Sequence, residues 1–403
     1  MAYLLKHGNV IPEPGHMIEG GSVLIAGGRL AAVGDWRLPV DETGEELLEI
    51  DLTGKYVLPG LIDAHTHLGI IEEATGQIGV DNNENSQPVT PHLRAIDAVN
   101  PNDVAFHDAV AAGITTVMTG PGSNNPVGGQ SIAIRTAGRI IDRMVLASPV
   151  GLKLALGENP LATYGKHERM PVTRLATAAL IRDLFMEAQD YLAAKDDGTQ
   201  RKREIRLEAV LPALRREIPL RVHAHRADDI VTAVRIAEEF GMDLVIEHGT
   251  EAHLVKEYLA EKRVPVAVGP MLTPRIKMEL KNRTYRTPRE LAEAGVKIAI
   301  ITDHPYNSIE YLRMITILAV KEGLPEDEAL RALTVHPAEM LRLDGRIGRL
   351  APGLEADLVV LDGPPLRFES NVLLVFQAGE IVYRRDMNER QAGGKGRRTT
   401  GGA

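Results

Sequence analysis

Cysteine is absent from the 403-residue chain. Disulfide bonds, thiolate catalysis and sulfur ligation of a metal are therefore excluded, so a metal site would have to use His, Asp, Glu or a modified Lys. Aromatic residues make up only 4% of the chain, although hydrophobic residues together reach 44%. Ala, Val, Leu and Ile must therefore build the core.

Long apolar runs and clustered positive charge are also missing. No stretch approaches the roughly 20 apolar residues of a membrane-spanning helix, and the first residues lack the apolar core of a secretory signal. The formal net charge is −9, without the basic stripe that a nucleic-acid-binding surface needs. We expect a cytoplasmic protein that acts on a small molecule and binds neither membrane nor nucleic acid. The sequence leaves the oligomeric state open, a homo-oligomer included.

Both ends of the chain show short alternating apolar runs separated by tight turns, in about residues 4–52 and 357–384. This texture is typical of small antiparallel strands. It predicts a small β-sandwich domain assembled from both termini, with residues 1–55 and 346–388 as its two parts. Residues 389–403, rich in Gly, Arg and Thr, have too little apolar surface to pack and are expected to be disordered.

Between these ends, short apolar runs alternate with amphipathic segments of helical length, for example 103–112, 173–194, 227–240, 252–261 and 288–294. The alternation indicates βα units and a parallel sheet, and predicts a (β/α)₈ TIM-like barrel over residues 56–345. The strands are expected at 57–64, 114–119, 131–135, 151–156, 220–225, 244–247, 265–268 and 297–302. The third strand has the weakest support, because 120–129 is a Gly/Asn/Pro loop with no obvious helix before that strand.

Residues that can bind metal follow several of these strands, where barrel enzymes place their chemistry. The first strand ends in His65 and His67, which the period of two puts on one face. Later strands end in His223, His225, His248, Asp303 and His304. A single histidine is more often a surface or packed residue. A cluster of buried imidazoles without a metal would waste polar groups, so coordination is the simpler explanation.

The run Gly60-Leu61-Ile62-Asp63-Ala64-His65-Thr66-His67, followed by later His, His and Asp, resembles the amidohydrolase superfamily, as does the segment 348–360. Within it the chain looks most similar to the imidazolonepropionase-related and prolidase-like metal-dependent hydrolases. The resemblance implies that His65 and His67 bind one metal. It also implies that His223 and His248 bind a second metal or complete a single site, and that Asp303 contacts metal and water.

Many relatives bridge two metals with a carboxylated lysine on the fourth strand, and Lys153 matches that position. A carbamate would convert a costly buried cation into the anion that two divalent ions need. Glu158, just after that strand, is the competing candidate, since other relatives use a glutamate and one metal. One or two divalent ions are therefore expected. Zinc is the first choice, but iron, manganese or cobalt would suit the same ligands.

Three further residues are candidates for contact with substrate. His225 should lie one step nearer the rim than His223, where it would touch the substrate and assist in polarising it. Arg226 offers a planar fork for a carboxylate, although such arginines also pair with a neighbouring acid. His304 follows Asp303 directly and has either a supporting role beside the site or a role in packing.

These observations predict a metal-dependent hydrolase that cleaves a carbon–nitrogen bond, in an amide or cyclic amide, of a small molecule. Typical peptides are not among the expected substrates, but dipeptides are. A metal-activated water would attack, with Asp303 as general base. One alternative is a deaminase or an imidazolone-type ring-opening hydrolase. Another is an inactive barrel scaffold, which would predict eroded ligands, whereas every expected position is filled.

Overall fold

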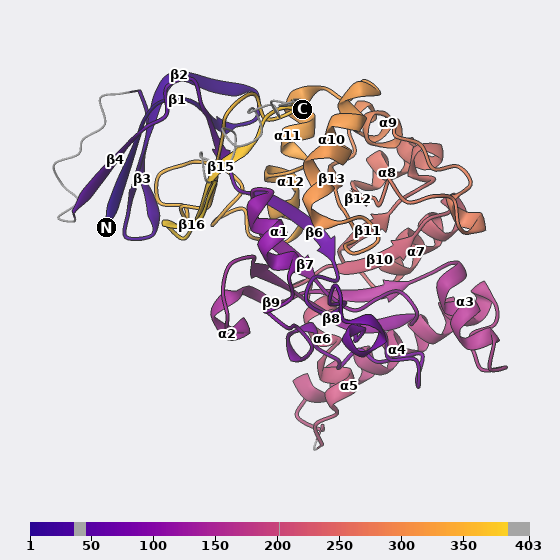
Figure 1. Ribbon diagram of the computed structural model, residues 1–403. Coiled ribbons are helices and arrows are strands. Elements are labelled where there is room, and N and C mark those ends of the chain that lie inside the picture. Colours follow the sequence, from indigo (N-terminus) through magenta and orange to yellow (C-terminus); the bar gives the residue numbers. More distant parts are fainter. Residues whose placement is uncertain (36–45, 201, 386–403) are drawn as a thin grey trace, which may run out of the picture.

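The computed structural model describes residues 1–35, 46–200 and 202–385, and its strands form two eight-stranded sheets (Figure 1). The predicted disordered tail, 389–403, lies outside the described residues. The first sheet contains β1 (Ala2–Glu13), β2 (His16–Ala26), β3 (Arg29–Gly34), β4 (Leu47–Asp51), β5 (Tyr56–Pro59), β14 (Leu358–Leu361), β15 (Val372–Gln377) and β16 (Glu380–Arg384). Strand β5 pairs with β1 on one side and with β14 on the other. Both ends of the chain therefore contribute strands to this sheet.

The second sheet holds its strands in sequence order and nearly closes into a barrel. It contains β6 (Leu61–Thr66), β7 (Ile114–Thr119), β8 (Val127–Arg135), β9 (Val145–Ala155), β10 (Leu220–Ala224), β11 (Leu244–His248), β12 (Val266–Val268) and β13 (Ile298–Ile300). The chain after β13 meets β6, because His67 N donates to His304 O at 2.8 Å and Thr302 N donates to Asp63 Oδ2 at 3.1 Å. The strand order predicted from the apolar runs is thus present in the described chain.

Two details of the predicted strands are wrong. Strand β8 runs antiparallel to both β7 and β9, so the expectation of eight parallel strands fails there. The connection 120–126 is too short for the helical crossover that a parallel pair needs. The predicted first strand, 57–64, is two strands in different sheets, β5 and β6, which meet at Gly60. A Cβ on Gly60 would lie 2.1 Å from Thr115 Oγ1, so this crossing point has no room for a side chain.

Helices cover the outside of the second sheet (Figure 1), and the five predicted helical segments correspond to α1, α4, α7, η3 with α8, and α9. The α-helices are α1 (Ala105–Ala111), α2 (Ile141–Met144), α3 (Glu158–Gly165), α4 (Arg174–Asp196), α5 (Ile205–Glu208), α6 (Leu211–Leu214), α7 (Ala227–Glu239), α8 (Lys256–Lys262), α9 (Thr287–Glu293), α10 (Leu312–Lys321), α11 (Glu326–Arg331) and α12 (Val335–Met340). Short 3₁₀ helices are η1 (Gly76–Gly79), η2 (Ala95–Asp97), η3 (Ala252–Val255), η4 (Met278–Leu280) and η5 (Ile309–Tyr311).

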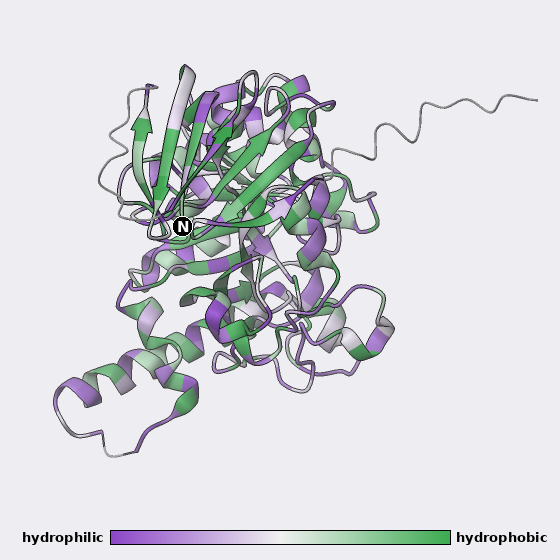
Figure 2. Ribbon diagram, turned by 60° about the vertical axis from the view of Figure 1, so that its left-hand side comes forward, coloured by the Kyte–Doolittle hydropathy of each residue, from purple (hydrophilic) through white to green (hydrophobic). Residues whose placement is uncertain are grey.

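The core is aliphatic, as the composition requires. Figure 2 shows the apolar residues concentrated on the strands, whereas the helices mix apolar and polar positions. Helix α7 buries Ile230, Ala233, Val234 and Ala237, and this spacing forms one stripe facing the sheet. No helix in the described ranges has both the length and the apolar character needed to cross a membrane.

Candidate metal centre

Polar side chains from strands far apart in the sequence converge at one end of the second sheet. They are buried, with exposures of 7% or less, and comprise His65, His67, His223, His225, His248 and Asp303. Their ligand atoms form overlapping groups within 4.8 Å of one another: His65, His67 and Asp303; His65, Glu247 and His248; and His223, His225 and His248. The structure therefore brings together six of the seven residues that the strand-end pattern selected, and His304 is the one that belongs to none of these groups.

The first group is built around one carboxylate oxygen. Asp303 Oδ1 lies 3.1 Å from His65 Nε2 and 3.4 Å from His67 Nε2. His67 Nδ1 donates to the carbonyl of Gly120 at 2.8 Å, which leaves its Nε2 unprotonated and directed at Asp303. A backbone carbonyl that fixes the tautomer in this way is the usual partner of a metal-binding histidine.

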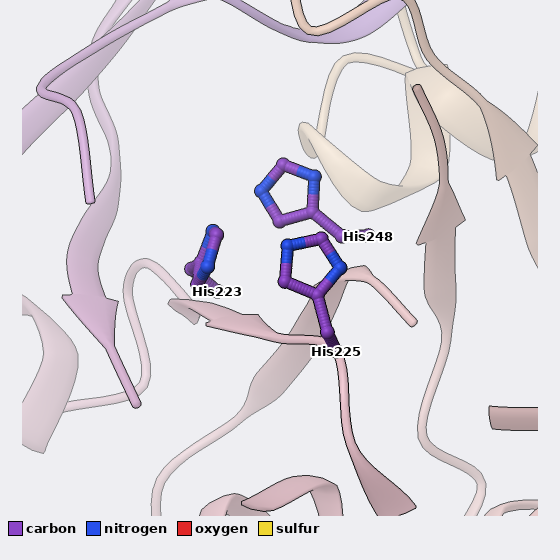
Figure 3. A group of neighbouring side chains, drawn as sticks. All are labelled: His223, His225 and His248. Atoms are coloured by element: carbon purple, nitrogen blue, oxygen red, sulfur yellow. The ribbon is translucent and has the colours of Figure 1, made fainter. Parts of the chain in front are cut away.

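The third of these groups consists of His223, His225 and His248 at the ends of β10 and β11, and their rings lie together in Figure 3. His248 Nδ1 donates to Gly269 O at 2.8 Å, and His225 Nδ1 contacts Thr250 Oγ1 at 2.7 Å. Their Nε2 atoms are thus the ones left for a ligand. Both ring nitrogens of His223 are buried and form no hydrogen bond with a described residue.

Two residues of the site have left-handed backbone conformations, with φ of 74° at His248 and 54° at Asp303. Such values are uncommon for residues other than glycine and tend to be held in place at functional sites. The adjacent Glu247 belongs to the same group of potential ligands as His248, although neighbouring residues of a strand alternate in direction.

The electrostatics keep the carboxylate ionised and two of the imidazoles neutral. Burial opposes ionisation of Asp303, but the nearby imidazoles of His248, His65 and His67 outweigh it and hold its pKa well below the usual range. Burial holds the pKa of His225 well below 6.5, and the nearby Lys277 ammonium adds to this effect. Burial and the adjacent histidines do the same for His223. Neutral imidazole and ionised carboxylate are the forms that bind a cation.

Glu247 was not singled out from the sequence, yet it organises the interior behind the histidines. Its Oε1 lies 2.9 Å from His65 Nδ1 and accepts a hydrogen bond from Arg221 Nε at 2.8 Å. Its Oε2 accepts from Lys153 Nζ. Lys153 and Arg221 stand opposite each other on β9 and β10. Charged residues of opposite sign within three neighbouring apolar strands were a signal that could have identified this network.

Of the two candidates for a bridging carboxylate, Glu158 lies outside the three groups of potential ligands in the described chain. Lys153 is buried and ion-paired with Glu247. Glu158 is the first residue of α3, and its Oε2 accepts a hydrogen bond from the backbone of Glu279 at 3.3 Å. Their roles as ligands stay predictions.

The structure places Arg226 and His304 away from the centre of the histidine cluster. Arg226 donates to both carboxylate oxygens of Asp228 at 2.8 Å, which is the pairing with a neighbouring acid considered above. His304 is fully buried behind the site, where its Nδ1 accepts from Ile309 N at 3.2 Å. Burial lowers the pKa of His304 to about 4. His304 thus packs as a neutral ring, whereas contact of either residue with substrate stays a prediction.

A second missed residue is Glu279, from η4 in the loop after β12. Its side chain is 1% exposed, and its Oε1 lies 3.8 Å from His223 Nε2 and 3.7 Å from His225 Nε2. Lys277 Nζ lies 2.5 Å from the same oxygen. No apolar periodicity marks this loop, so the sequence offered no signal that would bring Glu279 to the histidines.

The donor set fits a divalent cation. Imidazole nitrogens and carboxylate oxygens suit zinc, and they also suit other first-row metals. Buried atoms that form no hydrogen bond with a described residue gather here, including both ring nitrogens of His223 and Asp303 Oδ1. Because buried polar groups are normally satisfied, these atoms indicate that the site is built for an additional partner.

Comparison with known proteins agrees with this geometry. A crystal structure of an amidohydrolase from Thermotoga maritima MSB8 superimposes with a TM-score of 0.91 at 44% identity, covering 95% of this chain and 100% of that chain. The imidazolonepropionase of Anaeromyxobacter sp. (strain K) is 29% identical over 92% of both chains. Amidohydrolase tasK of Hapsidospora irregularis is 28% identical over 86% of this chain, which spans 38% of the length of tasK.

The model of the amidohydrolase family matches residues 56–385, which include the whole second sheet and every residue of the site. This match confirms the resemblance inferred from residues 60–67 and from the later histidines and aspartate. The protein therefore belongs to the amidohydrolase family and is a hydrolase that acts on carbon–nitrogen bonds.

Proposed function

We propose that the protein is a metal-dependent hydrolase that cleaves an amide or cyclic amide bond of a small molecule, with Asp303 as general base. The observation that carries this proposal is the position of Asp303, whose Oδ1 lies 3.1 Å from His65 Nε2 and 3.4 Å from His67 Nε2 at the end of the barrel. A buried, ionised carboxylate next to metal-binding imidazoles can both hold a cation and accept a proton.

A divalent cation bound at this centre would acidify a water molecule and polarise the scissile carbonyl. Asp303 would take the proton of that water and return it to the leaving nitrogen. His65 and His67 keep Asp303 in place, and their own positions are fixed by Glu247 and by the Gly120 carbonyl. A base whose position is fixed in this way loses no freedom during the reaction.

For the ligands, we propose that His65, His67 and Asp303 hold one cation and that His223 and His248 contribute to a second position or complete the first. The carboxylation of Lys153 stays a prediction, and its ion pair with Glu247 favours an unmodified ammonium group. Zinc is the proposed metal because imidazole and carboxylate suit it, with iron, manganese and cobalt as alternatives.

Two broader predictions accompany this function. They are the division of the chain into a barrel of TIM type at 56–345 and a small β-sandwich domain from 1–55 and 346–388, and a cytoplasmic location. The antiparallel pairing of β5 with β14 supports a β domain that contains strands from both ends of the chain. The oligomeric state, a homo-oligomer included, is open. Size-exclusion chromatography with light scattering would measure the oligomeric state.

The proposal is tested by incubating the zinc-loaded protein with dipeptides, N-acyl amino acids and cyclic amides, and measuring released amine or ring opening. Hydrolysis of at least one class that depends on Asp303 would support it. The similarity to imidazolonepropionases over 92% of the chain favours ring opening as the second candidate. Release of ammonia from an amidine would instead identify a deaminase. Inactivity of fully loaded protein on every class would favour the inactive scaffold.

Removal of the metal should both inactivate and destabilise the protein. A ligand that binds only the folded state at 1,000 times its Kd contributes about 4 kcal/mol of stability. We therefore expect dialysis against a chelator to abolish turnover and to lower the midpoint of thermal unfolding, and addition of zinc to restore both. An unchanged unfolding midpoint and full turnover in protein shown by elemental analysis to be free of metal would contradict a metal-dependent mechanism.

A further inference from the structure

We infer that Glu279 is a ligand of a second divalent cation, together with His223, His225 and His248. The inference rests on the proposed function, since it requires that the chain bind metal at all. It goes further by naming a carboxylate from the loop after β12 as the anionic ligand of the second position. It also assigns His225 to the metal in place of the substrate.

The distances around Glu279 Oε1 are those expected between ligands of a common ion. Its separations of 3.8 Å from His223 Nε2 and 3.7 Å from His225 Nε2 are too long for hydrogen bonds. Two ligands held about 2.1 Å from one zinc ion at the tetrahedral angle lie about 3.4 Å apart. The carboxylate oxygen thus stands at close to ligand spacing from two imidazole nitrogens that face it.

The three histidines have nitrogens available on that side. Hydrogen bonds engage the Nδ1 atoms of His225 and His248, and His223 forms no hydrogen bond with a described residue through either ring nitrogen. Figure 3 shows the three rings gathered around a common space. Three neutral imidazoles and one carboxylate make a four-ligand set of the kind that zinc binds.

The surrounding backbone is shaped around the Glu279 carboxylate. Its Oε2 accepts a hydrogen bond from Glu158 N at 3.1 Å, at the start of α3. Gly157 has a φ of 85°, and a Cβ at that position would lie 2.7 Å from the same Oε2. With Oε2 fixed by a backbone amide from behind, Oε1 is directed toward the histidines. Fixing a ligating carboxylate in this manner is typical of metal sites.

Lys277 supplies a counter-charge to Glu279. Its Nζ lies 2.5 Å from Glu279 Oε1 and donates to Asn159 Oδ1 at 3.0 Å. The ammonium group occupies the oxygen that the cation would use, so the two compete for it. Lys277 is 24% exposed and can turn toward solvent when a cation binds, whereas the buried Glu279 stays in place.

Because Lys277 and the cation compete for Glu279 Oε1, replacing Glu279 and replacing Lys277 should have opposite effects on cation binding. If Glu279 and Lys277 form only a structural ion pair, loss of either partner should change cation binding at the second position to a similar extent. If Glu279 is a ligand, Glu279→Gln should weaken cation binding at the second position, whereas Lys277→Met should strengthen it. Loss of a partner outside the ligand shell typically costs 10- to 100-fold in metal affinity, so we expect Glu279→Gln to cost at least about tenfold.

The experiment measures cobalt or zinc bound per chain by equilibrium dialysis and elemental analysis, over a range of free metal concentrations. We expect two ions per chain in the unaltered protein, one in Glu279→Gln, and two with a lower second Kd in Lys277→Met. Glu290→Gln is the matched control, because Glu290 is a partly buried carboxylate on α9 that is paired with a lysine, Lys256, as Glu279 is with Lys277.

The outcomes distinguish failure of the proposed function from failure of the inference about Glu279. An unaltered chain that binds no divalent ion overturns the proposed function and the inference with it. One ion per chain, or two ions in both the unaltered protein and Glu279→Gln at equal affinity, overturns the inference alone. Loss of the second ion in Glu158→Gln but not in Glu279→Gln would assign the ligand to Glu158. Should Glu279→Gln fail to fold, an unchanged or weaker second site in Lys277→Met would still contradict the inference.

Discussion

Replacement of Asp303 by asparagine is expected to lower kcat by about 10²- to 10⁴-fold, the range that a positioned general base contributes. Asparagine keeps a carbonyl oxygen near the position of Oδ1, 3.1 Å from His65 Nε2, but it cannot accept the proton of the attacking water. We therefore expect the variant to retain metal while losing turnover. The measurements are kcat on a substrate class identified among the amides, together with the metal content of the same sample.

The matched control for this prediction is Asp228→Asn. Asp228 is an aspartate on the first turn of α7 that pairs with Arg226 at the surface. Its loss should leave kcat within about twofold, because surface ion pairs contribute little. Full activity in Asp303→Asn with metal bound would remove Asp303 from the role of base. Loss of metal along with activity would instead reduce its role to that of a ligand.

The central part of this site was predictable because it follows from strand periodicity. Two residues apart on one strand, His65 and His67 must share a face, and parallel strands bring their carboxyl ends to one edge. His223, His248 and Asp303 could be placed by the same reasoning, and each is buried in the cluster. The periodic signal does not indicate which nitrogen faces the centre, since that depends on contacts such as His248 Nδ1 with Gly269 O.

The features that the sequence did not predict depend on more than the alternation of side chains along a strand. Glu247 belongs to the same group of potential ligands as His248, although alternation alone would separate neighbouring residues. Glu279 comes from a loop whose path is set by long-range contacts with the start of α3. Arg226 looked equally suited to substrate or to a neighbouring acid, and its pairing with Asp228 depends on the side-chain conformations of both residues.

In the fold, too, features set by the local sequence could be predicted, whereas features set by contacts between distant residues could not. Helix α7 was recognisable from its apolar stripe, and each barrel strand from its apolar run. The direction of β8 depends on the length of the preceding loop rather than on its own residues, so the run 131–135 could not reveal it. The division of 57–64 between β5 and β6 at Gly60 likewise depends on β1 and β14, which lie far away in the sequence.

Replacement of Glu247 by glutamine should lower the free energy of unfolding by about 3–5 kcal/mol, the cost of removing one partner from a buried ion pair. Glu247 and Arg221 are 0% exposed and Lys153 is 1% exposed. The neutral amide would leave two cations in the interior without their counter-charge. Urea unfolding of metal-free samples measures the effect. Glu238→Gln, at an exposed pair with Lys262, is the control and should change stability by less than about 1 kcal/mol.

The same variant also reports on the charge of Lys153. An ammonium group at Lys153 makes Glu247→Gln costly, and adding Lys153→Met should then recover part of the loss, because one of the two unpaired cations is removed. A carboxylated Lys153 would be an anion beside the Glu247 carboxylate, so Glu247→Gln would relieve repulsion and its cost would fall well below 3 kcal/mol. A small cost in the single variant, with no recovery in the double variant, would therefore contradict the ion pair and favour the carbamate.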